Sequence, residues 1–150
     1  MDTDFAYVAG LLRDLGRLAL LVKYPESYTN LLAVTREHGF DIRTVERDLF
    51  DIDHCEAGAW LMQRMPFPAE LCDVAAYHHD PVGDAPFKMV QLIRVADRLA
   101  DALGFAVIAY SSELTAYEAL SELPDAFRQR VQFEPEELKA DVESRISAWD

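Results

Sequence analysis

The chain has 150 residues, of which 51% are hydrophobic and 27% are charged. This length and composition are typical of one globular domain with a real core, and they exclude wholesale disorder. The formal net charge of −13 excludes a general nucleic-acid binder, because phosphate binding requires clustered Lys and Arg.

The cysteines and the apolar segments indicate a cytoplasmic protein. Cys55 and Cys72 are the only cysteines and have no CxxC spacing, so we expect a reducing compartment. The acidic start Met1-Asp-Thr-Asp lacks the basic region of a signal peptide. Charged residues interrupt the apolar stretch 11–22, and no segment approaches the roughly eighteen apolar residues of a membrane span. We therefore expect no membrane partner.

Apolar residues recur at helical spacing along the chain, whereas convincing strand alternation is absent. The first expected helix follows a cap at Thr3 or Asp4 and continues to about Val22. Apolar side chains occupy both of its sides, which predicts a central position. Pro25 at the first helical position and Gly39 after the last turn predict the second helix.

Two further helix starts carry capping residues. Asp41 is expected to cap a short third segment that ends near Phe50. Asp53 looks like the N-cap of a fourth helix, with Glu56 as its capping-box partner. This helix is expected to stop at the Pro66–Pro68 turn and to point these residues inward: Ala57, Trp60, Leu61 and Met65.

Prolines mark most of the remaining element ends. We expect a helix from Pro68 to about His79, a long helix from Phe87 to about Gly104, an ambiguous apolar region over Phe105–Ser112, a helix within Glu113–Val131 broken at Pro124, and a last helix from Pro135 to Trp149. No linker, repeat or second domain is indicated. The sequence thus predicts a single all-α domain, a multi-helix array over residues 1–150.

Five residues with metal-ligating side chains occur in a distinctive order: Asp14, His54, His78, His79 and Asp97. Their flanks are Gly10-Leu-Leu-Arg-Asp-Leu-Gly, Leu49-Phe-Asp-Ile-Asp-His-Cys-Glu-Ala-Gly, the Met65-Pro-Phe-Pro-Ala-Glu-Leu turn, and Val95-Ala-Asp-Arg-Leu-Ala. This pattern resembles the HD superfamily of metal-dependent phosphohydrolases, and above all its regulatory branch, the HDOD (HD-related output) domains of bacterial signalling proteins. The likeness covers nearly the full chain but only the later part of a complete HDOD domain, so we expect the leading helices to be missing before Phe5.

The resemblance implies an HD-like helical fold and a metal site, or its remnant, at these five residues. Carboxylate and imidazole donors together suit Mn, Fe, Mg or Zn, and two bridged metals can activate a hydroxide for phosphoryl transfer. In this chain Arg13 stands at the position of the doublet histidine, and a guanidinium cannot coordinate a cation. Arg17 stands where catalytic relatives carry lysine. We therefore expect a degenerate site without a functional dinuclear centre, and no cofactor.

Each candidate residue also has a purely structural explanation. These are an i,i+3 ion pair of Asp14 with Arg17, contacts of His54 with Asp51 or Asp53, interactions of His78 and His79 with a helix dipole, and intrahelical ion pairs of Asp97 with Arg94 and Arg98. Taken singly, each residue is explained well in this way. The order and the flanks together favour the remnant of a metal site.

Three functions are compatible with this pattern. The preferred one is a non-catalytic signalling module that contacts a partner protein or its own copy, because an array without its leading helices exposes apolar surface on its first helix. The alternative is an active metal-dependent phosphohydrolase or phosphodiesterase that holds Mn, Fe or Mg despite Arg13. The third, compatible with the first, is binding of a small anionic ligand by Arg13 and Arg17.

Overall fold

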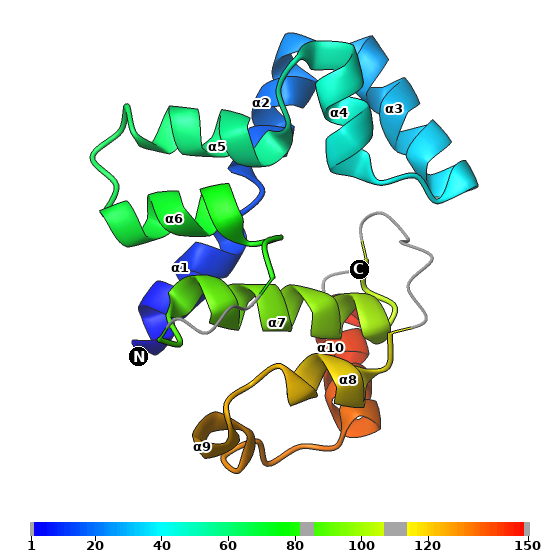
Figure 1. The fold of residues 1–150 in the computed structure, drawn as a ribbon. Helices are drawn as coiled ribbons and strands as arrows, with labels where there is room; N and C mark the ends of the chain where they lie inside the picture. Colours follow the sequence, from blue (N-terminus) through cyan, green and yellow to red (C-terminus); the bar gives the residue numbers. More distant parts are fainter. Residues whose placement is uncertain (1, 82–85, 107–113, 149–150) are drawn as a thin grey trace.

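The computed structural model describes residues 2–81, 86–106 and 114–148, and within these ranges it contains helices and no strand. Figure 1 shows the arrangement. The all-α prediction is therefore confirmed. None of these helices combines the length and apolarity that a membrane crossing requires. The helices are α1 (Thr3–Leu12), α2 (Leu15–Lys23), α3 (Pro25–His38), α4 (Ile42–Phe50), α5 (His54–Met62), α6 (Ala69–Tyr77), α7 (Met89–Ala102), α8 (Ala116–Ser121), α9 (Asp125–Arg128) and α10 (Pro135–Ser147).

The expected first helix is in fact two helices. The chain leaves helical geometry at Asp14, where φ is −97° and ψ is 18°, and the N–H of Arg17 donates to the carbonyl of Asp14 at 2.9 Å. The continuous helix to Val22 was a wrong prediction, because hydrophobic periodicity does not register a two-residue break. The cap is also one residue earlier, since the Asp2 side chain accepts from two backbone N–H groups of the first turn.

The local capping predictions for the next helices are confirmed. The Asp41 carboxylate accepts from the Thr44 N–H at 2.9 Å. Asp53 and Glu56 form the reciprocal capping box of α5. Gly39 ends α3 with a φ of 67°, a left-handed conformation that glycine adopts without steric cost.

Helices α2 and α5 pack with their backbones in close approach at two glycines. A Cβ atom on Gly16 would lie 1.8 Å from the carbonyl oxygen of His54 and 2.6 Å from the backbone nitrogen of Gly58. Only a residue without a side chain fits between the two helices here. This contact brings the start of α2, and with it Asp14, next to the start of α5.

Three apolar clusters fill the interior. The first joins α1, α5, α6 and α7; the second joins α2 to α5; and the third joins α7 to the C-terminal helices (Figure 1). Their buried members are Ala9, Met62, Leu71, Val74, Ala75, Met89 and Ile93 in the first; Leu20, Tyr28, Leu31, Ile42 and Ala57 in the second; and Val95, Leu99, Leu103, Ala119, Leu120 and Leu123 in the third. Helix α7 therefore links two clusters.

Several expected details of burial and length differ from the structure. Trp60 and Met65 were expected inside but are 52% and 42% exposed; the Trp60 ring lies under the Arg64 guanidinium at the surface, and Met62 is the buried residue instead. Helix α6 ends at Tyr77, two residues before His79. Helices α1 and α2 leave apolar side chains exposed, such as Leu11 on α1 and Val22 on α2, so the central position predicted for the first helix was wrong. The ambiguous region Phe105–Ser112 and Trp149 lie largely outside the described residues.

Candidate functional site

Four of the five predicted site residues converge where three helices meet. His54 is the first residue of α5, His78 and His79 follow the end of α6, and Asp14 immediately precedes α2. His54 Nε2 lies 3.1 Å from His79 Nε2 and 3.7 Å from Asp14 Oδ1, and His78 Nε2 lies 3.6 Å from the same Asp14 oxygen. Asp14 thus forms one cluster with histidines that follow it by 40 to 65 positions in the sequence.

The hydrogen bonds of His54 fix the orientation of its ring. Its Nδ1 donates to Glu46 Oε2 at 2.6 Å, and its backbone N–H donates to the same oxygen at 2.8 Å. The other Glu46 oxygen accepts from the Tyr28 hydroxyl at 2.6 Å. Because a carboxylate only accepts, Nδ1 carries a proton, and this hydrogen bond turns Nε2 toward the cluster.

The orientation of the His78 ring is fixed in the same way. Its Nδ1 donates to the backbone carbonyls of Val74 and Ala75 at 3.0 and 3.2 Å, in the last turn of α6, as the helix-dipole explanation anticipated. Its Nε2 is buried and has no hydrogen-bond partner among the described residues. A buried, unsatisfied ring nitrogen is costly, and this one faces the carboxylate of Asp14.

Arg13 joins the two aspartates of the predicted site. Its Nη2 lies 2.6 Å from Asp97 Oδ1, its Nε lies 3.2 Å from Asp14 Oδ2, and its Nη1 donates to the carbonyl of Gly10 at 2.9 Å. One guanidinium therefore neutralises a carboxylate from the α1–α2 turn and a carboxylate from α7. The fifth predicted residue, Asp97, is bound to Arg13 in this way.

The charges around Asp14 keep it ionised. Burial raises its pKa, but the interactions with His78, Arg17 and Arg13 outweigh burial and hold the pKa well below the usual range. The i,i+3 pair with Arg17, at 2.9 Å, matches the structural explanation. Burial, together with repulsion from His78 and His54, lowers the pKa of His79 to about 2, so this ring is neutral near neutral pH.

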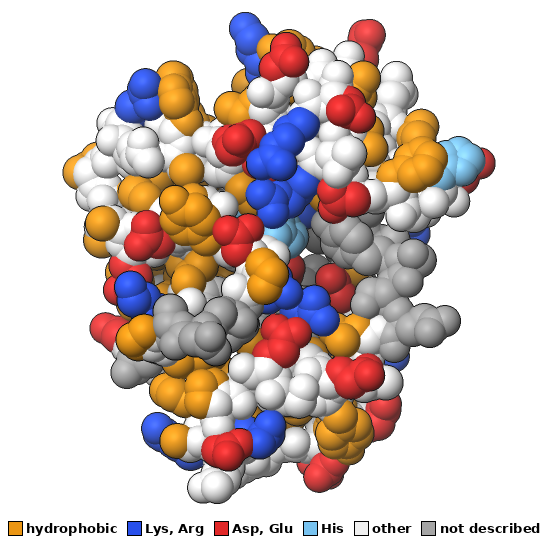
Figure 2. Space-filling model, viewed as in Figure 1, with side chains coloured by type: hydrophobic (Ala, Val, Ile, Leu, Met, Phe, Trp, Pro, Cys, Tyr) orange, Lys and Arg blue, Asp and Glu red, His pale blue; other side chains and the backbone are white. Residues whose placement is uncertain are grey.

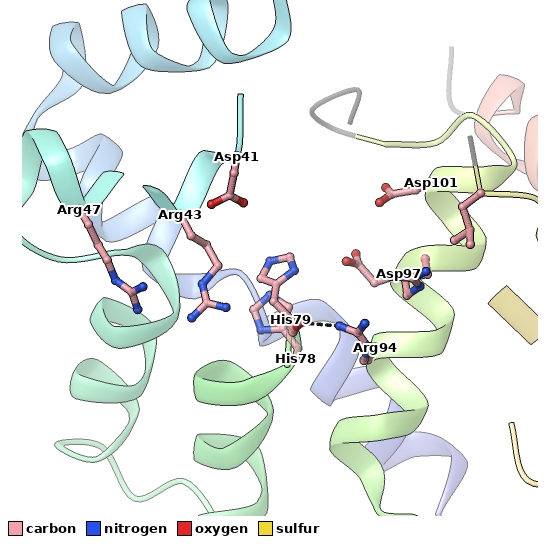
Figure 3. A pocket seen from close by; sticks show the side chains of 10 residues that line it. Asp41, Arg43, Arg47, His78, His79, Arg94, Asp97 and Asp101 are labelled. Atoms are coloured by element: carbon pink, nitrogen blue, oxygen red, sulfur yellow. Dashed lines mark hydrogen bonds between the residues drawn. The ribbon is translucent and has the colours of Figure 1, made fainter. Parts of the chain in front are cut away.

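A polar cleft of about 420 Å³ opens above His78 and His79. Figure 2 shows basic side chains on both sides of a hollow in this face, with a histidine visible inside it. Figure 3 shows that one wall comes from α4 and the other from α7. The side chains that line it are Asp41, Arg43, Arg47, His78, His79, Arg94, Asp97, Arg98, Asp101 and Leu114.

The arginines of the cleft all have acidic or carbonyl partners. Arg43 Nε and Arg47 Nη2 lie 2.9 and 2.7 Å from the buried carboxylate of Asp53. Across the cleft, Arg98 Nε lies 2.7 Å from Glu122, and Arg94 donates to the carbonyl of His79 (Figure 3). Because both walls carry their own counterions, the cleft is polar with mixed charge.

Two structural explanations from the sequence are wrong. Asp97 pairs with Arg13, while Arg94 and Arg98 pair with Glu122 at the end of α8. His54 is held by Glu46, which the sequence argument missed, instead of Asp51 or Asp53. The spacing of Ile42, Glu46 and Phe50 places a carboxylate within the apolar face of α4, and this signal could have identified Glu46 as a buried partner.

The donor set of the cluster fits a transition metal. The buried Nε2 of His78 lacks a partner, the Nε2 atoms of His54 and His78 both lie toward Asp14, and Asp14 is an ionised carboxylate. His54, Cys55, His78 and His79 also have possible ligand atoms that all lie within 4.8 Å of one another. Imidazole and carboxylate donors in such a group would hold Zn, Fe or Mn.

Comparison with known proteins identifies the family. The chain is 29% identical over 75 residues to a protein of Treponema pallidum (strain Nichols) that is described as uncharacterized. That match covers 50% of this chain but only 15% of the length of that relative. No solved structure matches the chain. A family model for the HDOD domain matches residues 1–81, more than half of the chain and the part that carries Asp14, His54, His78 and His79. The chain therefore belongs to the HDOD domain family.

Proposed function

We propose that this HDOD chain is a non-catalytic signal-transduction module that works in the bacterial cytoplasm through contacts with a partner protein or with a second copy of itself. The observation that carries the proposal is the pair of contacts from Arg13 to Asp14 and Asp97. These contacts engage both carboxylates that a dinuclear metal centre would need. A permanently charged guanidinium between them repels a metal ion and cannot act as a ligand.

An apolar groove between α1 and α7 supports the role in protein contact. It is lined by Ala6, Tyr7, Gly10, Leu11, Leu92, Ile93 and Ala96, nearly all of whose exposed surface is apolar. Tyr7 is 74% exposed and Leu11 is 69% exposed. Exposed apolar patches of this kind mark interaction sites in soluble proteins, and the groove lies on the first helix, where the sequence predicted such surface.

The alternative function is a metal-dependent phosphohydrolase. The convergence of His54, His78, His79 and Asp14 below an open cleft favours it. Catalysis would require a metal-bound hydroxide next to the phosphorus of the substrate. The ion pair of Arg13 with Asp97 stands against this chemistry.

Phosphodiester hydrolysis tests the proposal directly. We expect no Mn²⁺-dependent cleavage of bis(p-nitrophenyl) phosphate by the wild-type chain above a His38→Ala control, whose exposed histidine lies outside the site. The variant Arg13→His restores the doublet histidine. Turnover by the wild-type chain that is lost in Asp97→Asn would overturn the proposal.

Binding of a small anion in the cleft is a compatible second role. The arginines on both walls favour it, although Arg13 and Arg17, the residues suggested by the sequence, do not line the cleft. The test is thermal unfolding with nucleotides, since a ligand at a hundred times its Kd adds about 2.7 kcal/mol of stability. We expect a rise in Tm that Arg98→Ala removes. An unchanged Tm with every nucleotide would remove this role and leave the signalling proposal intact.

A further inference from the structure

We propose that the groove between α5 and α6 binds an extended, proline-rich segment of a partner protein, with a basic residue of that segment at the end of the groove next to α4. The inference deepens the proposed function and rests on it, because it names the kind of partner that the module contacts. The groove has a volume of about 440 Å³. Arg43 and Arg47 line both this groove and the polar cleft above the histidines, so the two hollows adjoin.

The first support is the shape of the groove. Trp60 of α5 and Tyr77 of α6 line it, and both side chains are about half-exposed. Ala59 and Ala76, their neighbours in the chain, also line it and are less exposed. The alanines therefore lie deeper than the aromatic rings, and a partner can approach the two helices closely there. Aromatic-lined grooves of this kind are the surfaces on which proline rings pack.

The second support is the fixed position of Trp60. The guanidinium carbon of Arg64 lies 3.6 Å from the centre of the Trp60 ring, and Arg64 Nη1 donates to the carbonyl of Trp60 at 2.9 Å. One arginine thus holds both the ring and the backbone of this residue. A rigid aromatic side chain loses little conformational entropy when a partner binds to it.

The third support is the length of the groove and its hydrogen-bond donors. Helices α5 and α6 have nine residues each, which corresponds to about 14 Å. A polyproline II segment rises about 3.1 Å per residue and leaves its backbone carbonyls unpaired, so about four or five of its residues span this length. Trp60, Gln63 and Tyr77 line the groove and can donate to such carbonyls through indole, amide and hydroxyl groups.

The charges next to α4 favour a basic residue in the partner. Arg43 and Arg47 pair with the buried carboxylate of Asp53 at 2.9 and 2.7 Å, so their charge is balanced within the protein. Glu56 and Asp80 also line the groove, are about half-exposed, and have long ion pairs of 3.5 Å with Arg47 and Arg43. Both carboxylates are therefore open to a cation of the partner. The net charge of −13 attracts a basic segment and repels an acidic one.

The test is titration of the full chain with the synthetic peptide Arg-Pro-Leu-Pro-Pro-Leu-Pro. In a Trp149→Phe background Trp60 is the only tryptophan, so its fluorescence reports on the groove. We expect a saturable change in this fluorescence and, by calorimetry, one peptide per chain. The same peptide with alanine in place of each proline should bind about ten-fold more weakly, because it does not hold the extended conformation in advance.

Variants of the two aromatic residues locate the site. Trp60→Ala and Tyr77→Ala should each weaken binding by about ten-fold in calorimetry, as is typical of aromatic residues at the centre of an interface. Tyr117→Ala is the matched control, since it removes another exposed tyrosine, on α8, and it should bind as the wild type does. Circular dichroism checks that each variant is folded.

The peptide's basic residue has its own test. Replacement of its arginine by glutamate should weaken binding by about two- to five-fold, the usual size of an exposed ion pair. Asp80→Asn should reduce this difference between the two peptides. An equal affinity for both peptides in the wild type would contradict the proposed orientation.

Other occupants of the groove would give different results. The inference is overturned if the peptide does not bind saturably, if the alanine peptide binds equally well, or if both aromatic variants keep full affinity. A fluorescence change with AMP but not with the peptide would indicate a nucleobase site. Self-association of the wild type that is lost in Trp60→Ala would indicate a contact between copies.

The outcomes separate this inference from the proposed function. Hydrolysis of a phosphodiester by a chain that binds the peptide would refute the non-catalytic function and leave the groove standing. Absence of both peptide binding and hydrolysis would refute the groove alone. Hydrolysis without peptide binding would refute both.

Discussion

The close contact between α2 and α5 at Gly16 predicts that one added methyl group has a large effect on stability. In Gly16→Ala the new Cβ would lie 1.8 Å from the His54 carbonyl oxygen and 2.6 Å from the Gly58 nitrogen. Cβ atoms essentially never approach a heavy atom within 3.0 Å, so α2 must move away from α5 by about 1.2 Å. Both obstacles are backbone atoms, which cannot rotate away.

The loss of stability in Gly16→Ala is estimated from the cost of overpacking, and Gly10→Ala serves as its control. Extra methyl groups in a packed core cost about 1–3 kcal/mol and occasionally more. Alanine in a helix interior raises the free energy of unfolding by about 0.5–1 kcal/mol relative to glycine. Gly10→Ala isolates this gain, since its Cβ would meet only Ile93 Cδ1 at 3.8 Å. Gly58→Ala should lie between the two, because its Cβ would lie 3.2 Å from the Gly16 nitrogen.

The assay is urea unfolding of the three variants and the wild type, followed by far-ultraviolet circular dichroism. We expect Gly10→Ala to equal or exceed the wild type in the free energy of unfolding. Gly16→Ala should fall about 1–3 kcal/mol below Gly10→Ala, because both variants share the gain in helix propensity and only Gly16→Ala carries the cost of overpacking. Equal stability of Gly16→Ala and Gly10→Ala would refute the close approach of α2 and α5, and with it the placement of Asp14 beside His54.

Three further outcomes follow from the buried carboxylate, from a titrating carboxyl and from the exposed face. Glu46→Ala leaves the Tyr28 hydroxyl and two donors of His54 unsatisfied, and it should lower the free energy of unfolding by about 3–5 kcal/mol. Tyr28→Phe removes only one of these hydrogen bonds and should lower it by about 1 kcal/mol. Equal losses of the two variants in urea unfolding would contradict this network. Burial and a neighbouring aspartate raise the pKa of Asp101 to about 6, so its ionisation opposes folding above pH 6, and this penalty disappears as the pH falls through 6 toward 4. Asp101→Asn should therefore stabilise the chain at pH 8 and lose its advantage near pH 4; a gain that does not vary between these pH values would contradict the raised pKa. In sedimentation velocity the wild type should self-associate in a concentration-dependent way and Leu11→Glu should not; a monomeric wild type at high concentration would argue against contact through a second copy.

Local signals predicted many of the helix starts correctly. Asp41, Asp53 with Glu56, and Pro25 each act within one helical turn of their own position. Such interactions depend only on neighbouring residues, so the sequence contains all the information they need. The prediction failed at Asp14, because the break between α1 and α2 goes with packing against α5 and with ion pairs to residues distant in the chain.

The candidate site was only partly predictable for the same reason. The family resemblance led to Asp14, His54, His78 and His79, and the structure brings them together. The resemblance could not show which residue forms a hydrogen bond with each histidine ring. Glu46 was missed because an acidic residue in a helix is usually exposed to solvent. The apolar positions around Glu46 were the available sign of its burial.

The sequence by itself determined that this protein is a helical array of the HDOD type and that its doublet histidine is an arginine. Only the tertiary structure decided that this arginine joins Asp14 to Asp97, and that the imidazoles converge on the other side of Asp14. The physical reason is the range of each effect. Helix periodicity and capping act over a few residues, whereas the partner of a charged side chain depends on which distant helix packs beside it, and here that packing depends on the contact between Gly16 and α5.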